Sequence, residues 1–499
     1  MEIRYKSTRS DLEVTASEAI LQGLSKDGGL FVPTQIPALD EDLNTLASMS
    51  YQELAYTVMS KFLTDFTEEE LKYCINGAYD SKFDSPLIAP LKKADGAYYL
   101  ELFHGTTIAF KDMALSILPY LMTTAARKNG VDQEIVILTA TSGDTGKAAM
   151  AGFADVPGTR IVVFYPKDGV SYIQERQMVT QRGENTCVAA ILGNFDDAQS
   201  AVKKMFGDPA LNERIGEAGF RFSSANSINI GRLVPQIVYY VYAYAQLVKS
   251  GEIKAGDLIN ITVPTGNFGN ILAAYYAKLM GLPVKQLICA SNVNKVLADF
   301  FETGEYDRKR EFILTSSPSM DILISSNLER LIYRITGNES ARCAAFMKDL
   351  SSKGEYCITD KMREGLKDFR GGFATEEENF AGIRELYEKT GYVIDTHTGI
   401  ANAVYRRYAA ETGDKTPTVI ASTASPYKFA GSVVGAISHE KAEGKSDFEL
   451  IDELRALSGV PEPPAITDIR TAPVRHETVT EIENMPDVVL KFLGLSDRA

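Results

Sequence analysis

Short apolar runs alternate along most of the chain with longer segments that have helical periodicity. Each run precedes a loop and usually a helical segment, and repeats of this unit predict parallel sheets covered by helices. Ligands of such sheets bind at the carboxyl ends of the strands, so functional residues are expected just after the runs. The predicted strands are Ile135–Leu138, Ile161–Phe164, Cys187–Ile191, Leu258–Val263, Leu287–Ala290 and Thr418–Ala421.

The two ends of the chain have a different pattern. Near the N-terminus, helices are predicted over Ser50–Leu63 and Thr67–Ile75, the second with a capping Thr67 followed by Glu70. Near the C-terminus, an acidic stretch carries prolines after Val460, which predict an extended strap. These differences predict an N-terminal unit of residues 1–95 and a C-terminal tail of residues 437–499.

Composition and charge narrow the class of protein. The chain has 499 residues, too many for one ordinary domain, and its 45% hydrophobic and 24% charged residues are typical of a globular protein. A net charge of −14 argues against binding to nucleic acid or anionic membranes, but not against a small anionic substrate. The five scattered cysteines and four dispersed histidines predict neither a disulfide framework nor a metal site. With no apolar segment typical of a secretory signal near the N-terminus, a cytoplasmic protein is expected.

The loop after the strand that ends at Val263 has the features of an anion site. Its sequence, Pro-Thr-Gly-Asn-Phe-Gly-Asn at 264–270, leads into the apolar helix Ile271–Leu279. Free backbone N–H groups and the helix dipole point at one spot there, and glycine lets the backbone approach a phosphate closely. An ordinary strand-to-helix turn with an asparagine cap is an equal alternative from this segment alone.

A second loop, Leu138–Lys147, superficially suggests an ATP-binding P-loop. That motif needs glycine where Thr141 stands and serine or threonine where Ala148 stands, so ATP is disfavoured. The hydroxyls and free N–H groups that remain at a helix start suit a carboxylate. Simple capping of the helix by Ser142 and Asp144 is the alternative.

Three further loops carry single reactive groups. Phe103–Asp112 contains Lys111 just before an apolar helix, Ser224–Arg232 brings polar groups and one guanidinium to the start of a long helix, and Ile420–Ser425 places hydroxyls after a buried strand. Each has an ordinary explanation: a solvated lysine, a structural salt bridge and strand-end capping. Together, however, the five loops supply an amine, a phosphate cradle, a carboxylate cradle, a second anion site and a hydroxyl. Pyridoxal 5′-phosphate (PLP) requires such a set.

Four motifs make the chain resemble the threonine synthases, PLP-dependent enzymes of fold type II. They run in consistent order within residues 1 to about 435, and they are most similar to the long branch of the family, which has an extra N-terminal domain. The motifs are Gly-Leu-Ser-x-Asp-Gly-Gly-Leu-Phe-Val-Pro (23–33), Phe-His-Gly-x-Thr-x-Ala-Phe-Lys-Asp (103–112), Thr-Ser-Gly-Asp-Thr-Gly (141–146) and Gly-Asn-Phe-Gly-Asn (266–270).

The resemblance implies a tryptophan-synthase-β-like α/β fold with two parallel or mixed sheet domains covered by helices, plus the N-terminal domain. It implies a large PLP-binding domain of residues 96–125 and 235–436, interrupted by an insertion at about 308–372. It also implies a small, mobile α/β domain of residues 126–234.

The resemblance also assigns roles to individual residues. Lys111 is implied as the Schiff-base lysine and proton shuttle, and Thr423 as the partner of the pyridine nitrogen. Asp144 stands near the cofactor's 3′-oxygen, where many relatives have asparagine and where an ionised carboxylate would repel a phenolate unless a proton is shared. The implied cofactor-phosphate residues are Gly266, Asn267, Phe268, Gly269 and Asn270. The implied substrate residues are Thr141, Ser142 and Thr145 for the carboxylate, and Asn226, Ser227 and Arg232 for the phosphate.

The activity that the resemblance implies is conversion of O-phosphohomoserine and water to threonine and phosphate. One alternative in the same fold is a PLP lyase such as a threonine or serine dehydratase, whose substrates carry no phosphate. A second alternative is a catalytically dead, threonine-synthase-like binding protein. The implied chain is a monomer or a homodimer.

Overall fold

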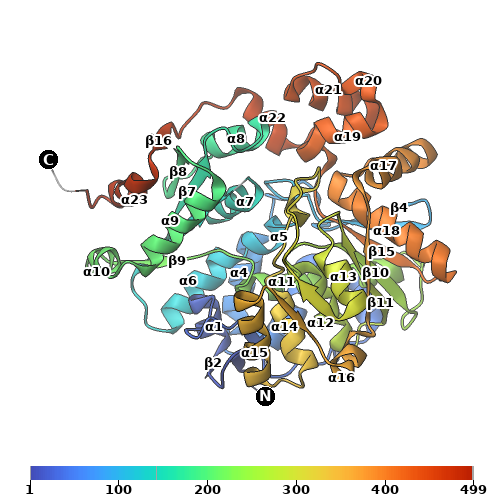
Figure 1. Ribbon diagram of the computed structural model, residues 1–499, viewed down its shortest axis with the longest axis horizontal. Helices are drawn as coiled ribbons and strands as arrows, with labels where there is room; N and C mark the ends of the chain where they lie inside the picture. Colours follow the sequence, from blue (N-terminus) through green and yellow to red (C-terminus); the bar gives the residue numbers. More distant parts are fainter. Residues whose placement is uncertain (1, 142, 497–499) are drawn as a thin grey trace.

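Two large sheets dominate the computed structural model, which describes residues 2–141 and 143–496 (Figure 1). The first has the strand order β14-β11-β10-β15-β5-β4, and the second has the order β16-β8-β7-β6-β9. The first contains β4 (Leu91–Ala94), β5 (Ala97–Glu101), β10 (Ile259–Pro264), β11 (Val284–Ser291), β14 (Phe369–Phe373) and β15 (Thr418–Ser422). The second contains β6 (Glu134–Ala140), β7 (Thr159–Pro166), β8 (Thr186–Ile191), β9 (Phe220–Ser223) and β16 (Thr478–Thr480).

Strand direction agrees with the prediction from the apolar runs. All neighbours in the five-stranded sheet are parallel, and in the six-stranded sheet only β4 runs antiparallel to its neighbour β5. Each of the six predicted runs lies within or overlaps a strand, because side chains on both faces are buried under helices. The expectation of parallel or mixed sheets covered by helices is therefore met.

The helices cover both sheets. The helices around the six-stranded sheet include α5 (Asp112–Leu115), α6 (Leu118–Lys128), α11 (Ile230–Lys249), α12 (Gly269–Leu279), α13 (Val296–Thr303), α17 (Glu376–Thr390) and α18 (Thr396–Thr412). Those with the five-stranded sheet are α7 (Asp144–Phe153), α8 (Tyr172–Val179), α9 (Phe195–Gly207) and α10 (Pro209–Glu217). Within residues 2–141 and 143–496, none of these helices combines the length and apolar character that a membrane crossing requires.

The N-terminal unit is a small sheet with four helices, which packs against α11. Its elements are β1 (Tyr5–Ser7), β2 (Glu13–Val14), β3 (Phe31–Pro33), α1 (Ala16–Gln22), α2 (Leu43–Ser48), α3 (Tyr51–Phe62) and α4 (Glu68–Ala78). Thr67 caps α4 as expected, since its hydroxyl accepts from the Glu70 N–H at 3.2 Å and Glu70 accepts from the Thr67 N–H at 2.9 Å. Residues 91–94, assigned to this unit by the boundary at residue 95, instead form β4 of the six-stranded sheet.

The segment interpreted as an insertion (308–372) is a run of short helices that ends inside the main sheet. It follows β12 (Glu305–Asp307) and contains η1 (Pro318–Met320), α14 (Leu328–Ile335), α15 (Ser340–Ser352), β13 (Glu355–Cys357), α16 (Asp360–Arg363) and η2 (Glu364–Leu366). Its last residues pair with β11 as the edge strand β14, so the range 369–372 belongs to the sheet rather than to an insertion.

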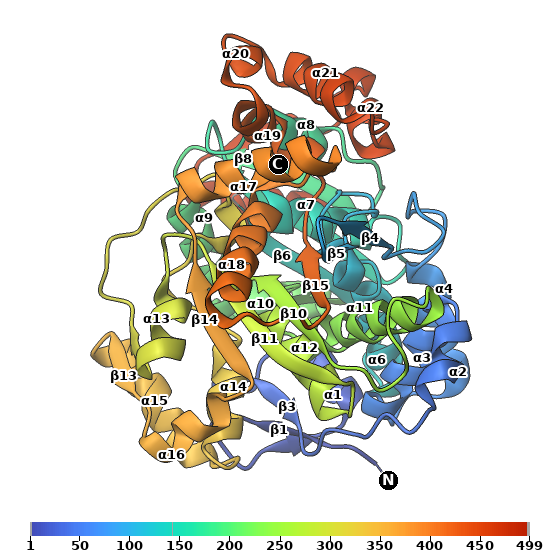
Figure 2. The same ribbon diagram turned by 90° about the vertical axis from the view of Figure 1, so that its right-hand side faces the viewer.

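The C-terminal tail is largely helical, which corrects the prediction of an extended strap. After η3 (Pro426–Phe429) and α19 (Ala430–Ile437) it forms α20 (His439–Ala442), α21 (Asp447–Ser458), α22 (Pro464–Thr471), η4 (Ile482–Asn484) and α23 (Met485–Phe492). Pro464 lies in the first turn of α22, where its missing N–H has no helical partner to lose. Helix α22 lies at one end of the molecule (Figure 2), and from there the tail runs to β16 and α23 beside the five-stranded sheet (Figure 1).

Candidate active site

The loops that carry Lys111 and Thr423 are joined by backbone hydrogen bonds. They follow the neighbouring strands β5 and β15, and the Phe110 N–H donates to the Thr423 carbonyl at 2.7 Å. Two residues further on, the Ser425 N–H donates to the Ile108 carbonyl at 3.0 Å. Two loops that lie more than 300 positions apart in sequence therefore form one wall of the candidate site.

Lys111 lies immediately before α5, with its side chain 12% exposed. Its Nζ donates to Ser319 Oγ at 3.0 Å and lies 3.7 Å from Asp144 Oδ2. Burial lowers the pKa of Lys111, and the charges of Lys428 and Arg232 lower it further, against the opposing effect of Asp144. The lowered pKa increases the fraction of neutral, nucleophilic amine.

Asp144, the first residue of α7, faces two lysines. One carboxylate oxygen lies 3.2 Å from Lys428 Nζ and also accepts from Gln174 Nε2 at 3.0 Å. Burial alone would raise the pKa of Asp144, but Lys428 and then Lys111 hold it well below its usual range. Asp144 is therefore an ionised carboxylate whose charge is balanced by neighbouring ammonium groups.

The loop 266–270 has the shape of an anion cradle. A Cβ atom at Gly266 would collide with the Ser319 carbonyl oxygen, so the position requires glycine. Phe268 adopts a left-handed backbone with φ of 64° just before α12, a strained conformation for a residue with a side chain. Gly269 then begins α12, whose first N–H groups are directed out of the helix end.

Asn270 carries an unsatisfied donor at this loop. Its Oδ1 accepts from the hydroxyls of Tyr239 and Tyr240 at 2.7 and 2.5 Å, and the residue is 7% exposed. Its Nδ2 has no hydrogen-bond partner among the described residues. Since a buried donor without a partner is unfavourable, the amide group is expected to meet a ligand.

The second predicted loop is only partly described. Ser142 lies outside the described residues. Thr141 is buried, and its Oγ1 accepts from the N–H groups of Gly143 and Gly146 at 3.0 Å each, while Thr145 lies half-buried in the first turn of α7. Thr141 thus shapes the start of the helix, and the remaining N–H groups there stay available for an anion.

Arg232 is the charged member of the third predicted group. It is 3% exposed; its Nη1 donates to the Ala225 carbonyl at 3.0 Å, while Nε lacks a partner in the part of the chain that the structure describes. Burial lowers the pKa of Arg232 to about 10, and the opposing influence comes from Tyr239, not from a carboxylate. Asn226 is exposed and Ser227 half-buried, both in the loop that leads to α11.

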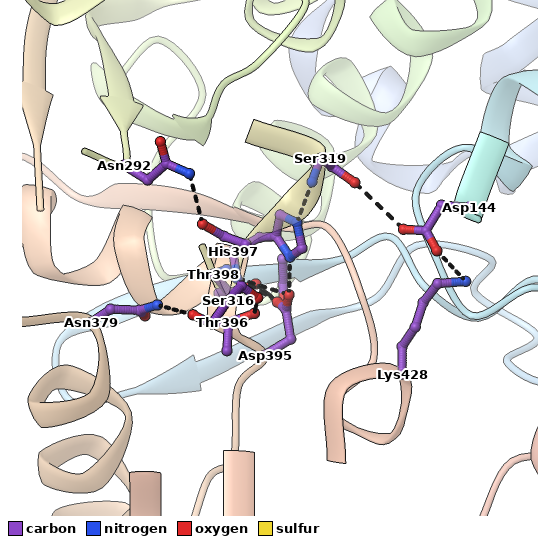
Figure 3. Close-up of polar contacts among 12 residues, drawn as sticks. Asp144, Asn292, Ser316, Ser319, Asn379, Asp395, Thr396, His397, Thr398 and Lys428 are labelled. Atoms are coloured by element: carbon purple, nitrogen blue, oxygen red, sulfur yellow. Dashed lines mark hydrogen bonds and ion pairs between the residues drawn. The ribbon is translucent and has the colours of Figure 1, made fainter. Parts of the chain in front are cut away.

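Four residues absent from the sequence-based prediction belong to the same cluster (Figure 3). Ser319, in η1, connects Lys111 with Asp144, to whose Oδ2 its hydroxyl donates at 3.4 Å. Lys428, in η3, has a side chain 1% exposed. His397 accepts from the Ser319 N–H, and its ring also contacts Asp395. Lys428 could have been found from the sequence, because it lies five residues after Thr423 in the same post-strand loop. The sequence around Ser319 has no pattern that points to a functional residue.

These residues fit pyridoxal phosphate. A desolvated lysine can bind the aldehyde, a glycine-shaped turn with an unpaired Asn270 amide can hold the phosphate, and the buried Thr423 hydroxyl lies in the loop bonded to that of Lys111. Gly266 lies against the Ser319 carbonyl and Lys111 donates to the Ser319 hydroxyl, so the phosphate cradle and the amine are both next to one residue.

Three sequence families match successive parts of the chain. The family described as threonine synthase N terminus matches residues 4–79, pyridoxal-phosphate dependent enzyme matches residues 86–424, and threonine synthase, C-terminal matches residues 398–485. The match to the PLP-dependent enzymes alone covers more than half of the chain.

Individual relatives agree with these matches. Threonine synthase from Saccharomyces cerevisiae is 36% identical over 91% of this chain and 93% of its own length. Threonine synthase-like 1 from Macaca fascicularis is 38% identical over 87% of this chain, which spans only 59% of that relative's length. The crystal structure of PLP-bound threonine synthase from Brucella melitensis superposes with a TM-score of 0.86 at 34% identity, over 100% of both chains. The predicted fold class and cofactor are thereby confirmed, and the chain belongs to the threonine synthase family of pyridoxal-phosphate-dependent enzymes.

Proposed function

We propose that this chain converts O-phospho-L-homoserine and water into L-threonine and phosphate. The observation that carries the proposal is the buried Arg232 guanidinium, whose Nε has no partner within the described residues and whose charge acts on Lys111. Lys111, Lys428 and Arg232 are formally cationic, whereas Asp144 is the carboxylate among the groups that shift the pKa of Lys111. Because an excess of buried positive charge is unfavourable, a further anion is expected beside the reactive lysine.

The cofactor's phosphate does not meet that need, since loop 266–270 is available for it. A substrate that carries its own phosphate supplies the second anion. Arg232 can bind a phosphate dianion with its forked donors, with Asn226 and Ser227 as proposed neutral partners. A dehydratase acting on serine or threonine would leave the Nε of this guanidinium without a partner and its charge without a bound anion.

The proposed roles of the remaining residues follow from their contacts. When bound, pyridoxal phosphate withdraws electrons from the substrate and stabilises negative charge on carbons near its amino group. Lys111 holds the cofactor and, with its lowered pKa, takes and returns protons at the substrate's Cα. Thr423 contacts the pyridine nitrogen, and the residues 266–270 bind the cofactor phosphate.

The start of α7 is the proposed binding site of the substrate carboxylate. Thr141, Ser142 and Thr145 supply hydroxyls, and the helix N-terminus supplies N–H groups and a favourable dipole. Asp144 does not bind the carboxylate, because two negative groups would repel each other; it balances Lys428 and Lys111 instead.

Product analysis tests the proposed function. The PLP-loaded protein should release threonine and phosphate in equal amounts from O-phosphohomoserine, measured by amino-acid analysis and a phosphate assay. With serine or threonine as substrate, little pyruvate or 2-oxobutyrate should form. Rapid keto-acid formation without phosphate release would favour the dehydratase, and no turnover despite bound cofactor would favour a binding protein.

The proposed location of this activity is the cytoplasm. It is supported by free cysteines at Cys74, Cys187, Cys289, Cys343 and Cys357, which are expected to stay reduced in that compartment.

A further inference from the structure

Ser319 contacts two functional parts of the site although it comes from the segment that follows β12. Its hydroxyl accepts from Lys111 Nζ at 3.0 Å and donates to Asp144 Oδ2 at 3.4 Å. A hydroxyl has one proton, and because that proton is directed to the carboxylate, a lone pair remains for the lysine. In this arrangement Ser319 stabilises the ammonium form of Lys111.

The backbone of Ser319 is held by a buried histidine. The Ser319 N–H donates to His397 Nε2 at 3.1 Å, so this ring nitrogen must be unprotonated. The other ring nitrogen, Nδ1, lies 2.8 Å from Asp395 Oδ2 and donates to it. Asp395 is 0% exposed and His397 is 3% exposed, so water does not compete for these bonds.

Asp395 has a fixed orientation of its own. It caps α18, with one carboxylate oxygen accepting from the His397 N–H at 2.9 Å and the other from the Thr398 N–H at 3.1 Å. Since all its neighbours are donors, Asp395 selects the histidine tautomer that has its proton on Nδ1. The helix start therefore determines which nitrogen faces Ser319 (Figure 3).

From this chain of contacts we propose that His397 and Asp395 form a positioning pair that seats Ser319, and that Ser319 orients Lys111 and maintains its ammonium form. Asp395 fixes the tautomer of His397, His397 fixes the Ser319 backbone, and the Ser319 hydroxyl meets the lysine. Ser319, His397 and Asp395 all lie more than 200 positions from Lys111 in the sequence. The inference rests on the proposed role of Lys111 as the lysine that binds the cofactor.

Attachment of the cofactor to apo-protein provides the measurement. The neutral Lys111 amine condenses with the aldehyde of added pyridoxal phosphate and releases water, and the visible absorption band reports the rate. The rate rises with pH, with a midpoint at the pKa of Lys111. The charged groups that face Lys111 are Asp144 from α7, Lys428 from η3 and Arg232 from α11, and all three are retained in every test variant.

Ser319→Ala should move this midpoint to lower pH by about one unit, because the ammonium form loses its acceptor. His397→Leu should move it in the same direction, whereas His397→Gln, which keeps an acceptor near the Nε2 position, should restore most of the difference. Nitrogen-15 spectra of the wild type should show His397 protonated on Nδ1 alone.

Ser317→Ala is the matched control. Ser317 belongs to the same loop, is 0% exposed and accepts from Asn292 Nδ2 at 3.0 Å, so its removal perturbs the loop without touching Lys111. It should leave the midpoint unchanged. A wild-type midpoint in Ser319→Ala, an equal shift in Ser317→Ala, or a proton on His397 Nε2 would overturn the positioning role. Attachment that persists in Lys111→Ala would instead refute the assignment of the cofactor lysine.

Discussion

The Lys428 ammonium lies 3.2 Å from the Asp144 carboxylate, with the two side chains 1% and 9% exposed. Lys111 lies 3.7 Å from the other carboxylate oxygen. Asp144 thus has two cationic neighbours, and only Lys111 has to lose its proton in the proposed reaction. Lys428 keeps the carboxylate paired when that happens, which explains how an aspartate is accommodated beside a reactive lysine.

Removing Lys428 should therefore destabilise the protein strongly. Lys428→Met leaves Asp144 with a weaker counter-charge, and breaking a buried pair from one side costs about 3–5 kcal/mol. The double variant Lys428→Met/Asp144→Asn should recover most of that loss, because the carboxylate that Lys428 balanced is removed as well. Denaturant unfolding of the two single variants and the double variant checks this. Losses that simply add would show that the two residues do not depend on each other.

Lys111→Ala should lose the visible absorption band of covalently bound cofactor and essentially all turnover. The matched control is Lys147→Met, because Lys147 is also a buried lysine, 8% exposed, whose pKa is lowered by burial to about 7. A lowered pKa does not distinguish the two lysines, since both have one. Of the two, Lys111 is the one connected to the predicted phosphate loop, through Ser319, and to the loop of Thr423. Borohydride reduction and peptide mapping should find the label on Lys111 in the control. A label on Lys147 in the wild type would contradict the assignment.

The central strands β6, β7, β8, β10, β11 and β15 were predictable from the sequence because most of their side chains are buried on both faces, whereas the edge strands β4, β9, β14 and β16 are half-exposed and were not predicted. Runs such as Ile135–Leu138 and Ile161–Phe164 contain consecutive apolar residues, and the structure places all of these side chains at 0 or 1% exposure. The loops after the strands could be compared by their chemistry, because parallel sheets bring these loops together at one edge. Lys111 stood in one of these loops, but its role as the cofactor lysine came from the resemblance to the threonine synthases.

The rest of the cluster depends on contacts that local patterns do not record. Ser319 is hydrogen-bonded to Lys111, 208 positions away in the sequence, and to His397, 78 positions away. Ser319 lies in the irregularly patterned segment 308–372, and His397 was one of four histidines dispersed along the chain. The prediction for the C-terminal tail was wrong for a different reason. Prolines predict an extended chain, yet Pro464 lies in the first turn of α22, where proline is tolerated.

Stability should depend on pH through His104, whose ring lies between two carboxylates. Nδ1 is 2.5 Å from Asp84 Oδ1 and Nε2 is 2.9 Å from Glu101 Oε2. Burial alone would lower the pKa of His104, but the hydrogen bonds to Asp84 and Glu101 raise it to about 9. A raised pKa stabilises the folded state fully below the unfolded pKa of about 6.5, and the effect is lost as the pH rises through about 9.

His104→Gln should therefore be less stable than the wild type by about 1–3 kcal/mol near pH 6, and the difference should shrink towards pH 10. Thermal unfolding across that range measures it, with the exposed His439→Gln as control. A difference that is constant with pH would mean that packing, not charge, makes His104 important.

Arg232 should separate substrate binding from cofactor binding. Charge-assisted hydrogen bonds to a buried anion contribute about 1.5–3 kcal/mol each, so loss of a bidentate pair should lower kcat/KM about 100- to 10,000-fold. Arg232→Ala should show this with O-phosphohomoserine while retaining pyridoxal phosphate, because the cofactor phosphate is assigned to loop 266–270. Arg232→Lys should recover only part of the activity, since an ammonium keeps the charge but not the fork.

The matched variant for this comparison is Asn270→Ala, which removes the unpaired Nδ2 at the proposed cofactor phosphate site. It should weaken cofactor binding in a titration, whereas Arg232→Ala should leave that titration close to wild type and lower kcat/KM even at saturating cofactor. Opposite responses of the two variants would establish two separate anion sites, one for each phosphate. If Arg232→Ala loses cofactor in step with activity, the guanidinium belongs to the cofactor site, and the argument for a phosphorylated substrate fails with it.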